Sequence, residues 1–554
     1  MATIQHPFQI EPLESRIAPA VIVVTALGDI PVTGKTTLRQ AIATADGSVT
    51  PDTIVFKAGI SGFITLQGST PLAITNAMTI VGPAGNKIVV DGQNNSSIFT
   101  IGSTSKVTLS GLTLIDGVNA SGDGGAILSS GPLTISNCVI TASSAEEGGG
   151  VYHSGAGPFV LINSLVSGNS AKDSSNGIGG GVYANASSGG VSIIGSKIIN
   201  NSSDSFGGGL RVEIPFADSG NVTISNTTFQ GNIGQTDDAG ASIDIVNSVS
   251  KVMISGSAFS GNVSGGEAGG LDISSHGPAL IVRTSIVNNI SAANGGGLTL
   301  FDNGGVTITG SRLSGNAAAG MSIGGAIYVG TSANTVTITG STIVDNQAYS
   351  GGGIGALSSG NLTISRSTIS ENHATADGGG IATDISGTVK ISGCTVSLNR
   401  TSATGGGLYL SGAGPITVQT TKIVGNNSAL VAGGAEISST SNQISMLANA
   451  FSNNVAAGNG GGLSIGGVCD FTITGGSFTG NSSGAHGGGI YISTGPSGII
   501  NEPGISITHN TSTLAGGGVA HASSSTGVVT LKTSAVTGNI EGVPKTDTYG
   551  NFAA

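Results

Sequence analysis

Three polar residues of the chain, Arg211, Asp244 and Asp272, have side chains that could do chemistry together, and Glu213 and Glu267 flank them. Two carboxylates about 5 Å apart can act as nucleophile and acid/base in a retaining glycoside hydrolase. The same oxygens also suit calcium. An arginine beside them could hold an acidic sugar. The set is therefore a candidate for polysaccharide chemistry, for a bound cation, or for a solvated acidic face that Arg211 partly neutralises.

A repeat positions these residues. The tripeptide Gly-Gly-Gly or Gly-Gly-Ala, followed by Ile, Val or Leu, recurs with a mean spacing of about 28 residues. Two copies are weakened and read Ala239-Gly240-Ala241 and Ala268-Gly269-Gly270. A period of this length is typical of stacked units that bury one continuous core. The third residue of each copy stands at position 126, 150, 181, 209, 241, 270, 297, 326, 353, 380, 407, 435, 462, 489 or 518.

Each repeat contains three short segments with strand character. The glycine motif leads into a strand such as 407–410, a second follows with the form of 306–311, and a third, shorter one ends in Asn, as at 313–316. Apolar residues alternate with Ser and Thr, which is typical of strands. The pattern predicts an all-β fold, a single right-handed parallel β-helix with three strands per coil, ~80 Å long at ~4.8 Å per coil.

The corners of the coil are polar. Glycine at one corner permits positive φ and close approach between coils. At the other corner an Asn recurs once per coil, where we expect left-handed backbone geometry and a ladder of amides bonded from coil to coil. The recurring Asn residues are at 169, 201, 232, 262, 289, 316, 346, 372, 399, 426, 454, 481, 510 and 539.

The same alternation places Arg211, Asp244 and Asp272 outward on the first strand of three consecutive coils, with the two aspartates about 5 Å apart. Longer repeats nearby predict loops at 172–178, 215–220 and 235–238, where binding often resides. Trp is absent and only 4% of residues are aromatic, which argues against a polysaccharide-active enzyme that binds its substrate on aromatic side chains. We therefore expect no catalytic, cofactor-binding or metal-binding residues, with a polysaccharide lyase or hydrolase at Asp244 and Asp272 as the alternative.

Composition excludes other classes. The net charge is −11, only 8% of residues are charged, and no basic stripe is present, so nucleic acid is not an expected partner. The longest apolar run near the N-terminus, 18–27, is too short to span a bilayer as a helix. The segment 34–36 (Gly-Lys-Thr) lacks the glycine of a phosphate-binding loop, because Asp29 stands in its place. Seven histidines are scattered singly, and Cys138, Cys394 and Cys469 lie in different coils, which predicts no disulfide framework.

The N-terminal part differs from the repeats. Residues 1–20 follow no repeat pattern, and the segment 13–20 resembles the Leu-Glu-x-Arg leader of exported planctomycete and verrucomicrobial proteins. Residues 21–115 predict a cap and irregular first coils, with a capped helix near 36–42 that covers the open edge of the first coil. This order resembles the N-terminal segment of bacterial β-helix surface proteins, in which Glu is usual where this chain has Gln40.

The regular repeats, 116–540, resemble those of the chlamydial polymorphic outer-membrane proteins, which alternate Gly-Gly-Ala-Ile with Phe-x-x-Asn. Residues 541–554 predict a short C-terminal cap. The resemblance implies an exported β-helix at the cell surface or in the extracellular matrix. We expect a non-enzymatic adhesin, spacer or assembly unit whose partners are glycans, cell-surface components or copies of itself, with no transmembrane segment.

Overall fold

The computed structural model describes residues 19–554, apart from 174–176, 187–188, 216–218, 302–303, 332, 359, 441–442, 494, 523–526, 533–534, 543–546, 551 and 553–554, and apart from the side chains of residues 502 and 503. Most of the predicted leader, 1–20, and parts of the predicted C-terminal cap lie outside these residues. None of the described helical segments has the length and hydropathy that a membrane-spanning helix requires.

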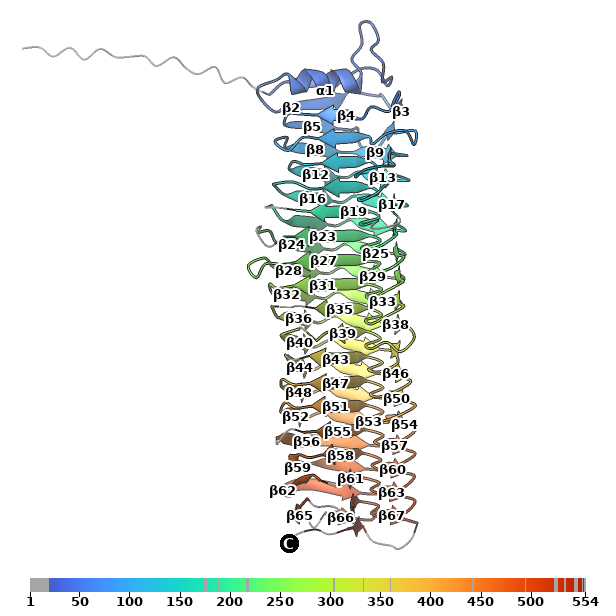
Figure 1. The fold of residues 1–554 in the computed structure, drawn as a ribbon, viewed down its shortest axis with the longest axis vertical. Helices are drawn as coiled ribbons and strands as arrows, with labels where there is room; N and C mark the ends of the chain where they lie inside the picture. Colours follow the sequence, from blue (N-terminus) through green and yellow to red (C-terminus); the bar gives the residue numbers. More distant parts are fainter. Residues whose placement is uncertain are drawn as a thin grey trace, which may run out of the picture.

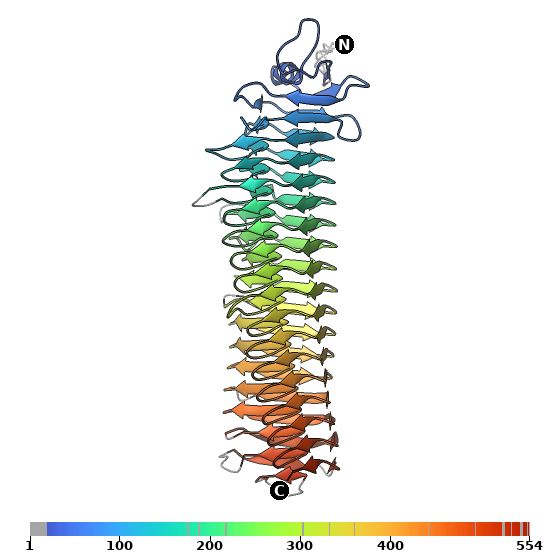
Figure 2. The same ribbon diagram turned by 90° about the vertical axis from the view of Figure 1, so that its right-hand side faces the viewer.

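The chain winds into one straight rod of about 17 turns, and its coils stack in a single column (Figures 1 and 2). All strand pairings between coils are parallel, as in β47 with β51 (Leu408–Gly412), where Ile381 pairs with Leu408. One coil illustrates the order: β47 (Ile381–Ile385) in sheet B, β48 (Val389–Ser392) and β49 (Thr395–Ser397) in sheet A, and β50 (Arg400–Thr401) in sheet C. The predicted all-β parallel β-helix is confirmed.

The three sheets run the length of the rod. Over the residues that the structure describes, sheet A has 34 strands because most coils give it two, and sheet C has 16 strands, each two residues long. The prediction of three strands per coil missed sheet C, since two residues are too few to show a period. Sheet B, which positions the candidate site, is formed by β4 (Leu72–Ile74), β7 (Phe99–Ile101), β11 (Ile127–Ser129), β15 (Val151–His153), β19 (Val182–Asn185), β23 (Leu210–Ile214), β27 (Ala241–Ile245), β31 (Leu271–Ser275), β35 (Leu298–Phe301), β39 (Ile327–Val329), β43 (Ile354–Ser358), β47, β51, β55 (Ala435–Ser439), β58 (Leu463–Gly467), β61 (Ile490–Ile492), β64 (Val519–His521) and β68 (Thr548–Tyr549).

The interior is one continuous apolar column, because alternate residues of each strand point inward. Ile, Val and Leu from all coils fill it, and phenylalanines stack within it. The rings of Phe229 and Phe259 are 4.7 Å apart and those of Phe451 and Phe478 are 4.6 Å apart, both nearly parallel. Burial of this column is the main source of stability.

The predicted asparagine ladder is confirmed. Each buried side-chain amide donates to the amide oxygen of the next coil, with Nδ2–Oδ1 distances such as 2.9 Å from Asn372 to Asn399. The ladder runs from Asn169 to Asn539. The predicted backbone geometry was wrong, because the residue before the ladder Asn takes the left-handed conformation, as Glu371 (φ 59°) and Leu398 (φ 57°) do. The ladder Asn itself thereby stays free to point its side chain into the turn.

The glycine corner has the two roles that were expected. Gly378 has φ +64°, and a Cβ on Gly379 would collide with the carbonyl oxygen of Gly406 in the next coil. Only glycine accepts the positive φ at Gly378 and the close approach of the next coil at Gly379 without strain. Similar collisions recur along the rod, so this corner sets how closely the coils approach.

The helix α1 (Leu38–Asp46) lies across the N-terminal end of the rod (Figure 1). Thr37 caps it, and the side chain of Gln40 accepts a hydrogen bond from the Thr37 backbone N–H at 3.0 Å, which completes a capping box. The side chains of Leu38, Ala41 and Ile42 form the buried face of the helix. The predicted N-terminal cap is therefore present, and Gln40 serves in the place of the usual Glu.

Candidate functional site

The outer face of sheet B carries one column of side chains in register from coil to coil. In β51 the side chains of Leu408 and Leu410 enter the core, so Tyr409 between them points outward. The backbone pairings align with Tyr409 a set that we call the outer column: Leu128, Tyr152, Tyr183, Arg211, Ser242, Asp272, Thr299, Tyr328, Gly355, Ala382, Tyr409, Glu436, Ser464, Tyr491, Ala520 and Tyr549. It includes all but one of the chain's 7 tyrosines.

The tyrosines of the outer column differ in exposure. Tyr183 and Tyr328 are buried, whereas Tyr152, Tyr409 and Tyr491 are half-buried and Tyr549 is exposed. Sequence reasoning missed this column, although each tyrosine follows the glycine motif at the same distance or closes the last coil. The signal was present as position within the repeat, and the low aromatic content concealed it.

Arg211 is the centre of a polar network on β23. It is 9% exposed, and its guanidinium nitrogens donate to Glu213 Oε1 at 3.0 Å, to Ser242 Oγ at 2.7 Å and to Asp244 Oδ2 at 3.1 Å. The ring of Phe206 lies 5.2 Å from its carbon Cζ. These contacts occupy Arg211 within the chain, so its part in the structure is to neutralise neighbouring carboxylates.

The predicted close pair of aspartates is not formed. Asp272 pairs with Ser242, and Asp244 pairs with Ser274, so the two carboxylates stand in different columns. The weakened motif was read one residue too late, because the pairing of Ala241 with Leu271 aligns Asp238-Ala239-Gly240 with the glycines of other coils. Asp238 occupies the first glycine's place, with φ 30°. The structure therefore brings Arg211 to Asp244, as expected, but does not place Asp244 above Asp272.

Asp272 instead belongs to a buried acidic group on β31 and the preceding loops. Burial first, then the charge of Asp238, raises the pKa of Asp272 well above its usual range. Burial first, then the charge of Asp237, raises the pKa of Asp238 to about 8, although Ser242 donates a hydrogen bond to it at 2.8 Å. Asp238, with its pKa of about 8, therefore holds a proton near neutral pH. Within the described residues, no three His, Cys, Asp or Glu side chains are placed to hold a metal ion, so the alternative of a bound cation at this set has no support there.

Charges are divided between the faces. Carboxylates gather on sheet B and the loops that precede its strands: Glu147, Glu213, Asp237, Asp238, Asp244, Glu267, Asp272, Asp377, Asp384 and Glu436. Exposed basic side chains lie in or beside strands of sheet A: Lys197, Lys251, Arg283, Arg312, Arg366, Lys390 and Lys422. Burial first, then the charges of Asp123 and Glu213, raises the pKa of Glu147 to about 7. The face that carries the tyrosines is thus acidic, and burial keeps several of its carboxyls wholly or partly protonated near neutral pH.

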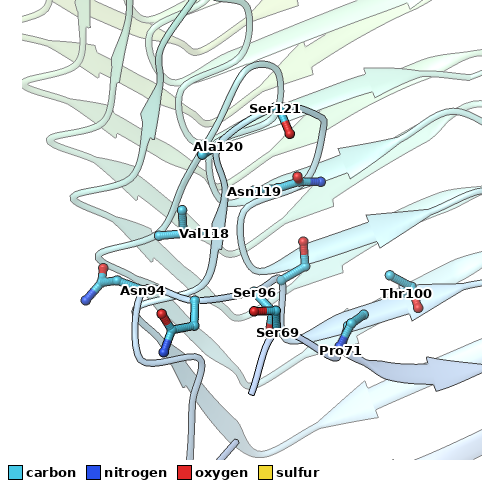
Figure 3. A pocket seen from close by; sticks show the side chains of 11 residues that line it. Ser69, Pro71, Asn94, Ser96, Thr100, Val118, Asn119, Ala120 and Ser121 are labelled. Atoms are coloured by element: carbon cyan, nitrogen blue, oxygen red, sulfur yellow. The ribbon is translucent and has the colours of Figure 1, made fainter. Parts of the chain in front are cut away.

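Two cavities open beside sheet B. One, of about 200 Å³, is lined by Asp377, Ala382, Asp384, Tyr409 and Ser411, among others. The other, of about 400 Å³, lies on the N-terminal coils, and Figure 3 shows Asn94, Ser96, Thr100 and Asn119 around it. Its lining residues are Ser, Asn, Thr, Pro, Val and Ala, so it offers hydroxyl and amide groups without charge. A third cavity, of about 400 Å³, lies on sheet A beside Met253 and Leu280.

The remaining predicted positions are structural or incompletely described. Of the three predicted loops, 172–178 and 215–220 lie partly outside the described residues. The third, 235–238, contributes Asp237 and Asp238 to the acidic group. Cys138, Cys394 and Cys469 are buried free thiols.

A comparison with models of protein families agrees with this architecture. Residues 282–451 and 325–512 match the family described as "Right handed beta helix region". A solved structure of a mannuronic acid specific polysaccharide family 6 lyase from human gut microbiota is similar at 10% sequence identity with a TM-score of 0.28, over 82% of this chain and 86% of that one. No curated protein matches the chain. The family match and the parallel coils together show that the chain is a right-handed parallel β-helix protein.

Proposed function

We propose that the chain is a non-enzymatic exported adhesin of the cell surface or extracellular matrix, and that its ligand is a linear glycan lying along the outer column of sheet B. The observation that carries the proposal is the straight row of partly exposed tyrosines set among small residues. Glu436 and Ser464 lie between Tyr409 and Tyr491, and Ala520 lies between Tyr491 and Tyr549. Aromatic rings offer large apolar faces that pack on sugar rings, and the small residues between them leave room.

The straightness of the rod favours a polymer over a compact ligand. Neighbouring positions of the outer column are one coil apart, ~4.8 Å, and the sheet holds them rigidly. A ligand with a repeating unit can therefore meet equivalent groups several times, and each added contact acts at high effective concentration.

A binding experiment tests this function. The full chain is passed over immobilised neutral, acidic and cationic glycans, and the natural protein is compared with Tyr409→Ala and Tyr491→Ala. Each substitution should weaken binding about tenfold, which corresponds to ~1.4 kcal/mol. Tyr349→Ala is the matched control, because Tyr349 is 39% exposed but stands outside the outer column. Equal effects of all three substitutions, or no binding by the natural protein, would contradict the proposal.

The same samples test the enzymatic alternative. If the chain degrades a glycan, new reducing ends or unsaturated products appear, and Asp244→Asn or Asp272→Asn abolishes them. We expect no product. Labelling of surface proteins on intact source cells tests export separately, and a protein protected from the label would contradict the surface role.

A further inference from the structure

One stretch of the acidic face combines a cavity, exposed aromatic rings and carboxylates. The cavity of about 200 Å³ has Asp377 and Asp384 in its lining together with Tyr409 and Ser411. Gly355 and Ala382 precede Tyr409 in the outer column, so two successive coils carry no large side chain there. The result is a notch bounded by the Tyr409 ring and two carboxylates.

The notch is negatively charged without a basic counterpart. Burial first, then the charges of Asp377 and Glu436, raises the pKa of the Tyr409 hydroxyl. Burial raises the pKa of Asp377 as well. The residues that line the notch include no Lys, Arg or His. A positively charged group would relieve this arrangement, whereas an acidic sugar would be repelled by it.

Glu436 adds an independent observation. It is 8% exposed, and its Oε2 atom is buried without a hydrogen-bond partner. Ala435 and Ile437 enter the core, so Glu436 points to the outer face, in register with Tyr409. The strand register places Glu436 between Tyr409 and Tyr491 in the outer column, and burial first, then nearby charges that include Glu436, raises the pKa of both tyrosines. The carboxyl has a hydrogen bond with Ser464, but its buried Oε2 atom has none, and such an atom is costly unless a proton or a cation satisfies it.

We infer that the stretch from Asp377 to Tyr491 binds a cationic amino-sugar polymer, with one protonated amine held by Asp377 and Asp384, another held by Glu436, and sugar rings packed on Tyr409 and Tyr491. This inference rests on the proposed function and specifies its ligand. Ammonium groups bind carboxylates through charge-assisted hydrogen bonds and are attracted to the faces of aromatic rings. Tyr409 and Tyr491 are three coils apart, ~14 Å, with Glu436 between them, and Asp377 and Asp384 belong to the coil before Tyr409, so a linear ligand that spans both rings passes all three carboxylates.

A sugar polymer fits better than a lysine-rich peptide. The tyrosines lie in one straight row on a rigid sheet, which matches a ligand of evenly spaced rings. A peptide chain would offer flexible amines but no ring faces for Tyr409 and Tyr491. A peptide would also lose more conformational entropy on such a row.

Calorimetric titration of the full chain tests the inference with three probes of equal length: a hexamer of β-1,4-linked glucosamine, its fully N-acetylated form and a uronic acid hexamer. At a pH where the amine is protonated, the glucosamine hexamer should bind at least tenfold more tightly than the N-acetylated one, and the uronic acid hexamer should not bind. Raising NaCl from about 50 mM to about 500 mM should weaken the glucosamine complex alone, since salt screens exposed charges.

Two variants locate the amine. Asp384→Asn removes an exposed carboxylate of the notch, and we expect about a tenfold loss for the glucosamine hexamer with no change for the N-acetylated one. Asp470→Asn is the matched control, because Asp470 is also exposed but lies on β59 (Asp470–Thr479) of sheet A. It should leave both affinities unchanged.

The outcomes separate the two proposals. Equal affinity for the glucosamine and N-acetylated hexamers, both weakened by Tyr409→Ala, would overturn the amine inference and leave the glycan-binding function intact. Hexalysine that binds as tightly as the glucosamine hexamer, with no effect of Tyr409→Ala, would overturn the inference in favour of a peptide. If no glycan binds, both proposals fail.

Discussion

Replacing one asparagine of the ladder tests how the coils are held together. The side chain of Asn399 donates to Ile369 O at 3.0 Å and to Asn426 Oδ1 at 2.9 Å. Its Oδ1 accepts from the backbone N of Asn372 at 3.0 Å and from Asn372 Nδ2 at 2.9 Å. Asn399→Ala therefore leaves two buried donors of Asn372 without that acceptor and opens a small gap.

The cost follows from these groups. Each buried polar group left without a partner costs ~1–3 kcal/mol. The gap adds about 1 kcal/mol. We expect Asn399→Ala to lower the free energy of opening of the adjoining coils by about 3–7 kcal/mol. Because each coil contacts only its neighbours, the effect should decay within a few coils.

Native-state hydrogen exchange at the backbone amide of Asn372 measures this free energy locally. Asn427→Ala is the control, because Asn427 is the next residue after a ladder position but its side chain is exposed. The control should change stability by less than about 0.5 kcal/mol. Equal effects of Asn399→Ala and Asn427→Ala would refute the view that the ladder stabilises the rod.

Three other substitutions probe the corner, the acidic face and the buried arginine. Gly379→Ala should cost more than about 3 kcal/mol in thermal or denaturant unfolding, because its Cβ would collide with Gly406, whereas Gly47→Ala at the end of α1 should be nearly neutral. Burial raises the pKa of Glu436 to about 7 from 4.5, so the folded chain retains a proton that the unfolded chain releases, and stability falls as the pH rises through that window. Glu436→Gln should remove this dependence and raise stability near pH 8 by up to about 3 kcal/mol, which melting curves at several pH values would show. Arg211→Ala should destabilise the central coils by about 3–5 kcal/mol, since it leaves Glu213 and Asp244 without their counter-charge.

Each of these three predictions would be contradicted by a specific outcome. A glycine corner that tolerates Ala at 379 would mean that the coils can separate there without cost. A pH profile that Glu436→Gln leaves unchanged would mean that another group titrates. Preserved stability after Arg211→Ala at low and high pH would mean that the network around it contributes little.

The fold could be predicted from the sequence because its determinants are local and repeated. The period of the glycine motif predicts the number of residues in one coil. The single Asn that recurs in each coil predicts the hydrogen-bonded ladder from Asn169 to Asn539. Sheet C could not be predicted, because its two-residue strands carry no period of their own. The left-handed residue before each ladder Asn varies in type, from Gly231 to Leu398, so no single residue announced it.

The candidate site was harder to predict because it depends on alignment between coils. The motif of this coil ends at Gly240 and not at Ala241, so Asp244 is the fourth residue after it, whereas Asp272 is the second residue after Gly270. The two carboxylates therefore do not form the pair that the sequence suggested. The row of tyrosines could likewise be found only by comparing equivalent positions of different coils. Tyr409 is unremarkable within its own strand, and only stacking the coils shows that it shares a row with Tyr491.

The asparagine ladder has a consequence for how such a molecule changes length. Each inner ladder Asn bonds to an identical Asn in the coil before it and in the coil after it. A duplicated coil therefore brings the Asn that both of its new neighbours need. Insertion of one repeat lengthens the rod by ~4.8 Å and leaves the ends untouched. The length of the rod can thus change in small, equal steps through unequal recombination within the gene.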